Sequence, residues 1–504
     1  MAPPSQNLVT SLEFLKPLQD QGMAAIPSSR LTRTHRERLV RNGFLREVVK
    51  GWYIITRPDD RPGDSTAWFA SFWSFCTGYL NARFGSDWCV GPERSLSLLT
   101  GDWTVPPQLL VRAPAGGNKP LALPFQTSMF DLRLALPAER DRRIENGVRM
   151  FSLPAALIAV SAPFFSQEPI IARAALAAIG DASEILADLL ENGRSTVAGR
   201  LAGALRNIGR NNIADDIMAA MRTAGYSVSE ANPFQGLPDL TADLGVASPH
   251  VNRQTMNWQR MRTDILKWFP PAPAEMPDIS TYMQQVEDAY VVDAYNSLSI
   301  EGYRVTEGLI ERVRAGDWNP DAVAADRDRR NAMAARGYWQ AFQRVKQSLV
   351  RVLNLENSGV VARNDHASWY RELFGPSITA GIVRPSDLAG YRSGSVFIRG
   401  SAYMPPACEA VRELMPAFFD LLESETEPAV RVVLGHFVFV HIHPYFDGNG
   451  RMGRFLMNVM MASAGYPWTV VPVARRDDYM AALERASAAG DIVPFTRFLG
   501  SLIP

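Results

Sequence analysis

The sequence has few cysteines, few histidines and no excess of either charge. Its 504 residues include three cysteines and six histidines. Cys76, Cys89 and Cys408 are scattered without metal-ligand spacing. This distribution argues against a disulfide framework and indicates a reducing, cytoplasmic compartment. Basic and acidic residues number 52 each, so no overall charge directs the chain to nucleic acid or to a membrane. Any binding of that kind must come from a local patch.

Long apolar runs are also missing. The most apolar windows, residues 153–165 and 432–440, are too short to span a bilayer. The first residues lack a basic segment followed by an apolar stretch, so we expect no secretion signal and no membrane partner. The length suits two to four domains, each with its own core.

The most informative segment is the run 443–454, HPYFDGNGRMGR. Gly448 and Gly450 flank Asn449 and let the backbone point N–H groups at a close ligand. The apolar residues that follow indicate a helix beginning near Gly450, whose N-terminus would add positive potential. Arg451 and Arg454 lie three residues apart, so they share a helix face and can bind phosphate oxygens.

Two further groups in this run suit reactions of phosphate esters. His443 titrates near neutrality and can accept a proton, and Asp447 is a hard oxygen ligand for Mg²⁺. The run resembles the signature loop of the Fic family, His-x-Phe-x-Asp/Glu-Gly-Asn-Gly-Arg-x-x-Arg, with Tyr445 at the usual Phe position. The resemblance implies transfer of AMP from ATP to a Ser, Thr or Tyr hydroxyl of a protein target.

The resemblance also implies a role for each residue of the loop. His443 would deprotonate the target hydroxyl, and Asp447 would hold Mg²⁺ between the α- and β-phosphates. The amides of residues 448–450 would bind phosphate oxygens, with the Asn side chain orienting the phosphates and stabilising the loop. Arg451 and Arg454 would neutralise the β- and γ-phosphates. ATP as substrate and Mg²⁺ are therefore the implied small-molecule partners.

A second motif lies upstream of the loop. Ser297, Glu301 and Gly302 match the family's inhibitory pattern, Ser/Thr-x-x-x-Glu-Gly/Asn, at the end of a helix predicted over about 282–301. In relatives this Glu pairs with the second Arg of the loop, here Arg454, which would otherwise hold the γ-phosphate. A carboxylate and a phosphate compete for one guanidinium. The alternative is a solvated carboxylate at a helix end.

Residues 391–406 alternate apolar and polar side chains between glycines and end in Pro-Pro, which predicts a β-hairpin. This segment resembles the family's flap, whose edge binds the target by strand addition. The alternative is an ordinary surface hairpin. The residues expected to contact the target are Val396, Phe397, Ile398 and Arg399.

A basic patch occurs near the N-terminus, where residues 29–50 contain seven Arg or Lys and two Glu. The order helix, basic helix, then two strands resembles the winged helix-turn-helix of AbiEi-type antitoxin regulators, which implies DNA binding. Contact with a protein is the alternative. The candidate DNA-binding residues are Arg33, Arg36, Arg38, Arg41 and Lys50.

The predicted fold class is mainly α, with four regions along the chain. Residues 1–62 form a winged-helix-like domain, 63–228 a mixed α/β domain, 229–275 an irregular linker, and 276–504 an all-helical Fic core with its flap. The rival function is a DNA-binding regulator or fused toxin–antitoxin protein whose Fic domain senses nucleotide or transfers another phosphate-containing group. The sequence leaves open whether the chain acts as a homodimer.

Overall fold

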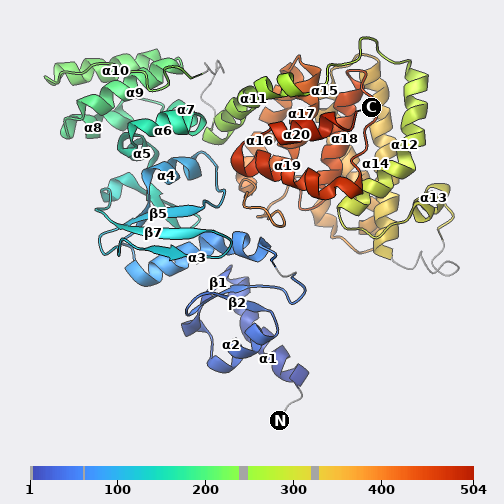
Figure 1. The fold of residues 1–504 in the computed structure, drawn as a ribbon, viewed down its shortest axis with the longest axis horizontal. Helices are drawn as coiled ribbons and strands as arrows, with labels where there is room; N and C mark the ends of the chain where they lie inside the picture. Colours follow the sequence, from blue (N-terminus) through green and yellow to red (C-terminus); the bar gives the residue numbers. More distant parts are fainter. Residues whose placement is uncertain (1–3, 61–62, 238–247, 319–328, 504) are drawn as a thin grey trace. The chain divides into compact units, whose positions relative to one another are not determined.

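The structure is a computed structural model that describes residues 4–60, 63–237, 248–318 and 329–503. The chain forms two compact units. The N-terminal unit comprises residues 1–253 and 397–404, and the C-terminal unit comprises residues 254–396 and 405–504. Helices predominate and the strands of the described residues all lie in the N-terminal unit, as the predicted mainly α fold requires (Figure 1).

The N-terminal unit begins with two helices and a small antiparallel sheet in the order β1-β3-β2. Buried apolar residues, Leu15 and Leu39 among them, join the helices to the sheet. Thr32 caps the second helix by accepting the N–H of His35. The elements are α1 (Pro4–Asp20), β1 (Ala25–Pro27), α2 (Arg33–Arg41), β2 (Leu45–Val49) and β3 (Trp52–Ile55).

A mixed α/β region follows, in which a four-stranded sheet has the order β4-β5-β7-β6. Among its described strands β5 and β7 pair in parallel, and the core beside them is rich in aromatic residues such as Trp68 and Trp88. The elements are α3 (Thr66–Phe84), β4 (Cys89–Val90), α4 (Pro92–Leu99), β5 (Gln108–Ala113), β6 (Pro120–Ala122), β7 (Ser128–Arg133), β8 (Arg142–Glu145) and β9 (Val148–Phe151).

Six helices with a separate Ala- and Leu-rich core complete the N-terminal unit. Small residues allow close packing: a Cβ on Gly199 would lie 1.9 Å from the carbonyl oxygen of Ser229. The helices are α5 (Leu153–Ala159), α6 (Ala162–Gln167), α7 (Pro169–Ala177), α8 (Ser183–Glu191), α9 (Ser195–Asn207) and α10 (Asn211–Thr223).

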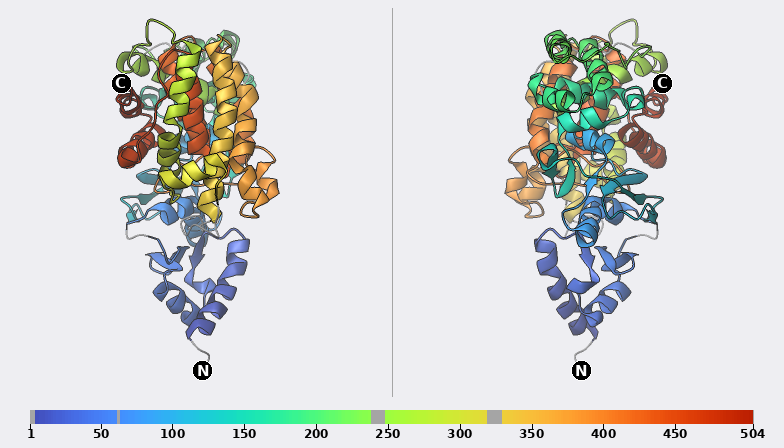
Figure 2. Two further views of the ribbon diagram at one scale, coloured as in Figure 1. Left: turned by 90° about the vertical axis from the view of Figure 1, so that its right-hand side faces the viewer. Right: turned by 90° about the vertical axis from the view of Figure 1, so that its left-hand side faces the viewer.

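The C-terminal unit is a bundle of helices, several of which run side by side (Figure 2). In its centre α18 packs against α12, α14, α15 and α17. The helices are α11 (Pro249–Trp268), α12 (Ile279–Ile300), α13 (Glu307–Ala315), α14 (Arg329–Leu353), α15 (Ser358–Thr379), α16 (Cys408–Ser424), α17 (Pro428–Ile442), α18 (Asn449–Ala462), α19 (Arg476–Ala489) and α20 (Val493–Gly500).

Two sequence-based expectations are wrong. Residues 229–275, expected to be an irregular linker, include the 20-residue helix α11, which buries Met256, Met261 and Ile265. Residues 391–406, expected to be a β-hairpin, contain no strand. Within the described ranges, no helix has the length and apolar character needed to cross a membrane.

Candidate active site

The loop 443–448 joins α17 to α18 and has unusual backbone geometry at both ends. His443 ends α17 with φ 53° and ψ 60°, and Gly448 precedes α18 with φ 84°. Left-handed geometry is costly for a residue with a Cβ. At Gly448 a Cβ would also lie 2.7 Å from the ring of Phe374. The sharp turn therefore requires glycine at one end and a constrained His at the other.

His443 is held so that one ring nitrogen faces away from the backbone. Its Nδ1 lies 3.2 Å from the carbonyl oxygen of Val440. A carbonyl only accepts, so Nδ1 carries the proton and Nε2 keeps its lone pair. Burial, together with the charge of Arg392, lowers the pKa of His443 to about 4. The imidazole is thus neutral near pH 7 and able to accept a proton.

Arg392 fixes the backbone of the loop and was missed by the sequence analysis. It is 1% exposed. Its Nε donates to the carbonyl oxygen of His443 at 2.8 Å, its Nη1 donates to Gly394, and its Nη2 donates to Pro406. Its own N–H donates to the carbonyl oxygen of Pro444 at 2.8 Å. The guanidinium thereby holds the base in position without facing a ligand.

Tyr445 and Asn449 lock the middle of the loop. The Asn449 side chain accepts the N–H of Tyr445 at 2.9 Å and donates to its carbonyl oxygen at 2.8 Å. The Tyr445 ring stacks on that of Tyr370, with centroids 3.7 Å apart. Asn449 thus stabilises the loop, and the aromatic character at position 445 serves as an anchor.

Asp447 supplies the carboxylate of the loop, and 59% of its side chain is exposed. Its Oδ1 accepts the N–H of Gly448 at 2.6 Å and lies 3.3 Å from Nη2 of Arg451. No cluster of three or more metal-binding side chains occurs in the described part of the chain. One exposed carboxylate still fits Mg²⁺, because this ion keeps several waters and takes its remaining ligands from phosphates.

Arg451 is a buried cation with unused donors. It is 1% exposed, and its guanidinium lies 5.1 Å and 5.0 Å from the ring centroids of Tyr303 and Phe374. Its Nε makes no hydrogen bond to any described residue, and its Nη2 has only the 3.3 Å ion-pair contact with Asp447, which lacks hydrogen-bond geometry. Buried N–H groups without an acceptor are costly, so this geometry favours an anionic ligand.

Arg454 is bound from α12. Its Nε donates to Oγ of Ser297 at 2.8 Å, and its Nη2 donates to the Ser297 carbonyl oxygen at 3.1 Å. The same Nη2 lies 2.7 Å from Oε1 of Glu301, the residue that caps α12. Its Nη1 has no hydrogen-bond acceptor among the described residues. The structure thus brings together two residues of the predicted inhibitory motif and the second Arg of the loop.

Glu301 also lies at the N-terminus of α18. A Cβ built on Gly450 would stand 2.3 Å from its Oε1 and 3.2 Å from Nη1 of Arg454. The first amides of a helix lack intrahelical acceptors and carry partial positive charge. The carboxylate therefore occupies a position suited to a phosphate. Gly302, which follows it, has φ 85° and no neighbour within 4 Å of a Cβ position.

The segment predicted as a target-binding hairpin is divided between the units. Val396 belongs to the C-terminal unit, whereas residues 397–404, including Ile398, belong to the N-terminal unit. Arg399 lies 3.2 Å from Asp64, and Phe397 is 45% exposed.

Backbone groups further along this segment are already bonded. The N–H of Gly400 donates to Oγ1 of Thr66 at 2.8 Å, and the carbonyl oxygen of Ala402 accepts the N–H of Val105 at 3.0 Å. The alternating pattern thus reflects an extended segment packed on α3 and its surroundings.

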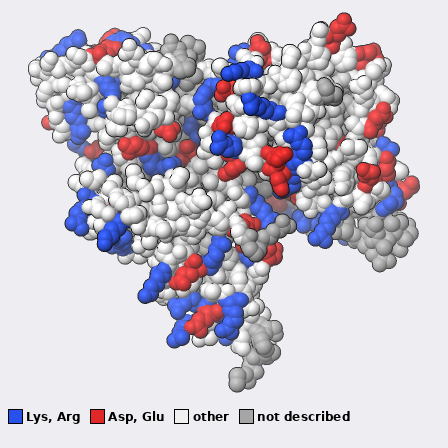
Figure 3. Space-filling view, viewed as in Figure 1, with Lys and Arg blue, Asp and Glu red and all other residues white. Residues whose placement is uncertain are grey.

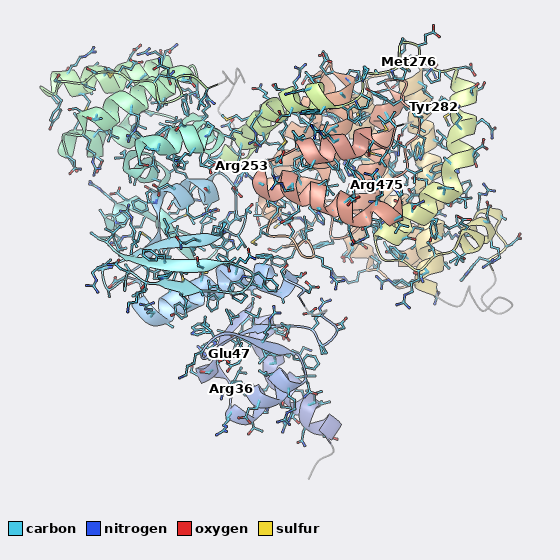
Figure 4. All side chains as sticks on the ribbon, viewed as in Figure 1. Arg36, Glu47, Arg253, Met276, Tyr282 and Arg475 are labelled. Carbon is cyan, nitrogen blue, oxygen red and sulfur yellow. The ribbon has the colours of Figure 1, made fainter. Side chains whose placement is uncertain are left out.

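The basic residues of the N-terminal unit are partly used for folding. Arg38 donates to the Asn7 carbonyl oxygen and to Oγ of Ser11, which ties α2 to α1. Arg36 lies over the ring of Tyr53, whose hydroxyl donates to Glu47 (Figure 4). These two arginines are therefore structural at least in part.

The other three basic candidates are exposed. Arg33 pairs with Glu37 at 2.7 Å, and Arg41 and Lys50 lie at the surface. On the face shown in Figure 3, basic and acidic side chains alternate over this part of the chain. The patch is less uniformly positive than the sequence alone indicates.

Comparisons with known proteins agree with the family resemblance of the loop. Residues 366–461, which include the loop, match the model of the Fic/DOC family. The chain is 31% identical over 217 residues to "Protein adenylyltransferase Fic" of Drosophila willistoni, covering 42% of this chain and 40% of that protein. It is 32% identical over 218 residues to the protein of the same name in Nematostella vectensis, covering 42% and 47%. The chain thus spans less than half the length of these relatives.

Solved structures also align with parts of the chain. A Fic-1 fragment from C. elegans aligns with TM-score 0.37 and 18% identity, covering 66% of this chain and 95% of that one. A Fic domain containing signaling protein from Bacteroides thetaiotaomicron aligns with TM-score 0.34 and 17% identity, covering 49% and 93%.

Proposed function

Because residues 366–461 form a domain of the Fic/DOC family, we propose that this chain is a protein adenylyltransferase inhibited by its own Glu301. The observation that carries the proposal is the pair of buried arginines beside the α18 N-terminus. Arg451 and Arg454 have donor nitrogens without acceptors among the described residues, and the Glu301 carboxylate is the anion that reaches Arg454. A triphosphate would supply the missing acceptors.

The reaction follows from the position of His443. The oxygen of a target Ser, Thr or Tyr hydroxyl attacks the α-phosphorus of ATP, and its proton passes to Nε2 of His443. The bond between the α-phosphorus and the bridging oxygen breaks, and pyrophosphate leaves. General-base catalysis of this kind contributes roughly 10²–10⁴-fold. Arg392 keeps the imidazole in place through the backbone.

The remaining loop residues bind and neutralise the nucleotide. Of the predicted amides 448–450, that of Gly448 donates to Asp447, so those of Asn449 and Gly450 would face the phosphates. Arg451 and Arg454 would bind the β- and γ-phosphates. Asp447 would hold Mg²⁺, which when bound neutralises charge on the α- and β-phosphates. All these residues come from one chain, so the proposed site and its inhibition require no homodimer.

Isotope position tests which group is transferred. The Glu301→Gly protein is incubated with Mg²⁺, a host lysate and ATP labelled at either the α- or the γ-phosphorus. Label on protein from α-labelled ATP alone supports AMP transfer. Label on protein from γ-labelled ATP would mean phosphate transfer. If neither form of labelled ATP labels any protein, the result would contradict the enzymatic proposal. The Glu301→Gly/His443→Ala protein is the control for non-enzymatic labelling.

A second proposal concerns the N-terminal unit, in which α2 follows β1 and a short 3-10 turn and precedes a two-stranded wing, β2 and β3. We propose that this part binds DNA through the exposed Arg41 and Lys50. Removing either side chain should weaken binding to every DNA sequence. It should also reduce the slope of log affinity against log salt concentration by about one. Fluorescence anisotropy with duplex DNA, comparing Arg41→Ala and Lys50→Ala with the unchanged chain, tests this. Equal binding by all three proteins would contradict it and favour protein contact.

A further inference from the structure

A buried polar cluster lies beside Arg454. Asp293 and Ser297 project from α12 and are 3% and 1% exposed. Tyr338 projects from α14 and is fully buried. The loop motif does not include Asp293 or Tyr338, and the inhibitory motif includes only Ser297. Buried polar groups require partners, so the contacts of this cluster define its role.

Two hydrogen bonds and the spacing of α12 place this cluster beside Arg454. The Tyr338 hydroxyl donates to Oδ2 of Asp293 at 2.7 Å. Asp293 and Ser297 lie four residues apart in α12, so they share one face of the helix. Ser297 accepts Nε of Arg454 at 2.8 Å. The buried carboxylate therefore lies one helical turn from the oxygen that binds Arg454.

The opposite charges of Asp293 and Arg454 also connect the two residues. Arg454 is 3% exposed, so its cation needs anions nearby, and Glu301 and Asp293 both attract it. Burial raises the pKa of Asp293 to about 6, while Tyr338 and Arg454 oppose this rise. Tyr338 and Arg454 stabilise the ionised form of this carboxylate, which balances the charge of the arginine.

The two acidic partners differ in how readily they can leave. Glu301 caps the end of α12 and its side chain is 23% exposed, so it can be replaced by a ligand from solution. Asp293 lies earlier in the same helix, within its interior, and is 3% exposed. When Glu301 is displaced, Asp293 remains as the fixed anion of Arg454.

We propose that Asp293 is a positioning residue for the nucleotide: its buried carboxylate, one turn before Ser297 in α12, keeps the Arg454 guanidinium oriented toward the γ-phosphate. This rests on the proposed function, because it assigns Arg454 to that phosphate. Asp293 attracts Arg454 whether Glu301 or a phosphate binds the guanidinium. Removing its charge should therefore weaken ATP binding even where inhibition has been removed.

Nucleotide titrations of the full chain test the proposal. Dissociation constants for ATP and ADP are measured by calorimetry with Mg²⁺ in the Glu301→Gly protein, with and without Asp293→Asn. Asparagine keeps the shape and can still accept from Tyr338, so only the charge is removed. We expect the dissociation constant for ATP to rise about tenfold, as for a hydrogen-bonded charged group. That for ADP should change less than about twofold.

Two hydroxyl deletions complete the design. Tyr338→Phe removes the hydrogen bond that holds the Asp293 carboxylate, without changing charge, and should also weaken ATP binding more than ADP binding. Tyr282→Phe removes another buried hydroxyl from α12, one that donates to the Tyr466 carbonyl oxygen, and should leave the ratio of the two constants unchanged (Figure 4). Melting curves establish that each variant is folded.

The outcomes separate this inference from the proposed function. Equal weakening of ATP and ADP by Asp293→Asn and Tyr338→Phe, or no weakening of either, would overturn the positioning role. A Glu301→Gly protein that binds neither nucleotide would overturn the proposed function itself. Selective weakening of ATP binding supports both.

Discussion

The carboxylate of Glu301 lies 2.7 Å from Nη2 of Arg454, directly over the first turn of α18. The guanidinium is buried and the carboxylate is partly exposed. A partly exposed anion that holds a buried cation is placed to be exchanged for another anion. We therefore interpret this ion pair as the resting state of a nucleotide site.

Removing only the charge of Glu301 should strengthen ATP binding. Glu301→Gln keeps the side-chain shape but gives Arg454 a weaker acceptor, so we expect ATP affinity to rise about tenfold. The control is Glu311→Gln, which breaks an ion pair of the same 2.7 Å length with Arg314 at the surface. An exposed pair contributes little, so that change should leave affinity unaltered. An equal change in ATP affinity for both substitutions would argue against the exchange of Glu301 for a phosphate at Arg454.

The rate should depend little on pH near neutrality. His443 must be neutral to accept a proton, and burial holds its pKa at about 4. A lowered pKa keeps the base form present to lower pH, so kcat/KM of Glu301→Gly should stay flat around neutrality. It should fall only on further acidification. A rate that halves near pH 6.5, the ordinary pKa of His, would contradict this assignment.

The same lowered pKa predicts a change in stability. Between about pH 6.5 and 4 the unfolded chain binds a proton at this imidazole and the folded chain does not. The contribution of His443 to stability is therefore complete above about pH 6.5 and declines as the pH falls toward 4. His436, fully buried and with its pKa also lowered to about 4 by burial, should act in the same direction. Melting temperatures across this range measure the decline.

Arg392→Lys should lower kcat without weakening ATP binding. Lysine lacks the planar guanidinium whose separate nitrogens reach the carbonyl oxygens of His443 and Gly394, so the base is no longer held in a fixed position. We expect a fall in kcat of about tenfold or more, because small displacements of a catalytic group are costly. Arg384→Lys, at an exposed ion pair with Asp387, is the matched control. A change confined to KM for ATP would count against a positioning role.

Two glycines with the same backbone geometry should differ in their tolerance of alanine. Gly302 and Gly448 have φ 85° and 84°, so each alanine costs about 1–2 kcal/mol for the left-handed conformation. At Gly302 the Cβ meets open space, whereas at Gly448 it meets Phe374 at 2.7 Å. Gly448→Ala should therefore lower the free energy of unfolding by about 1–3 kcal/mol more. The free energies of unfolding are measured by denaturant titration. Equal decreases in the two alanine variants would contradict this prediction.

The loop was predictable because its groups are contiguous. His443, Asp447 and Arg451 lie close together in the sequence, and glycine at position 448 is needed for both backbone and space. Arg392 and Tyr370 could not be found in this way. They act on the loop through a backbone carbonyl and through ring stacking, from positions far away in the sequence. Asp293 gave no signal either, since a single acidic residue within a helix is typical of a solvated position.

The two wrong predictions have different physical causes. The pattern at 391–406 predicts extended backbone paired with a second strand, but its hydrogen-bond partners are Thr66 and Val105 instead. In α11 the spacing of Trp258, Met261 and Ile265 is helical. Prolines and glycines on either side of that helix concealed it. The resemblance of residues 1–62 to antitoxin regulators stays a prediction.

The most direct test of the central claim is the initial rate of AMP incorporation from α-labelled ATP. Three full-length proteins are compared on one protein substrate: the unchanged chain, Glu301→Gly, and Glu301→Gly/His443→Ala. If Glu301 holds Arg454 away from ATP and His443 is the base, Glu301→Gly should be at least about tenfold faster than the unchanged chain. The double variant should be inactive. Equal rates for the first two proteins, or activity in the third, would contradict the account.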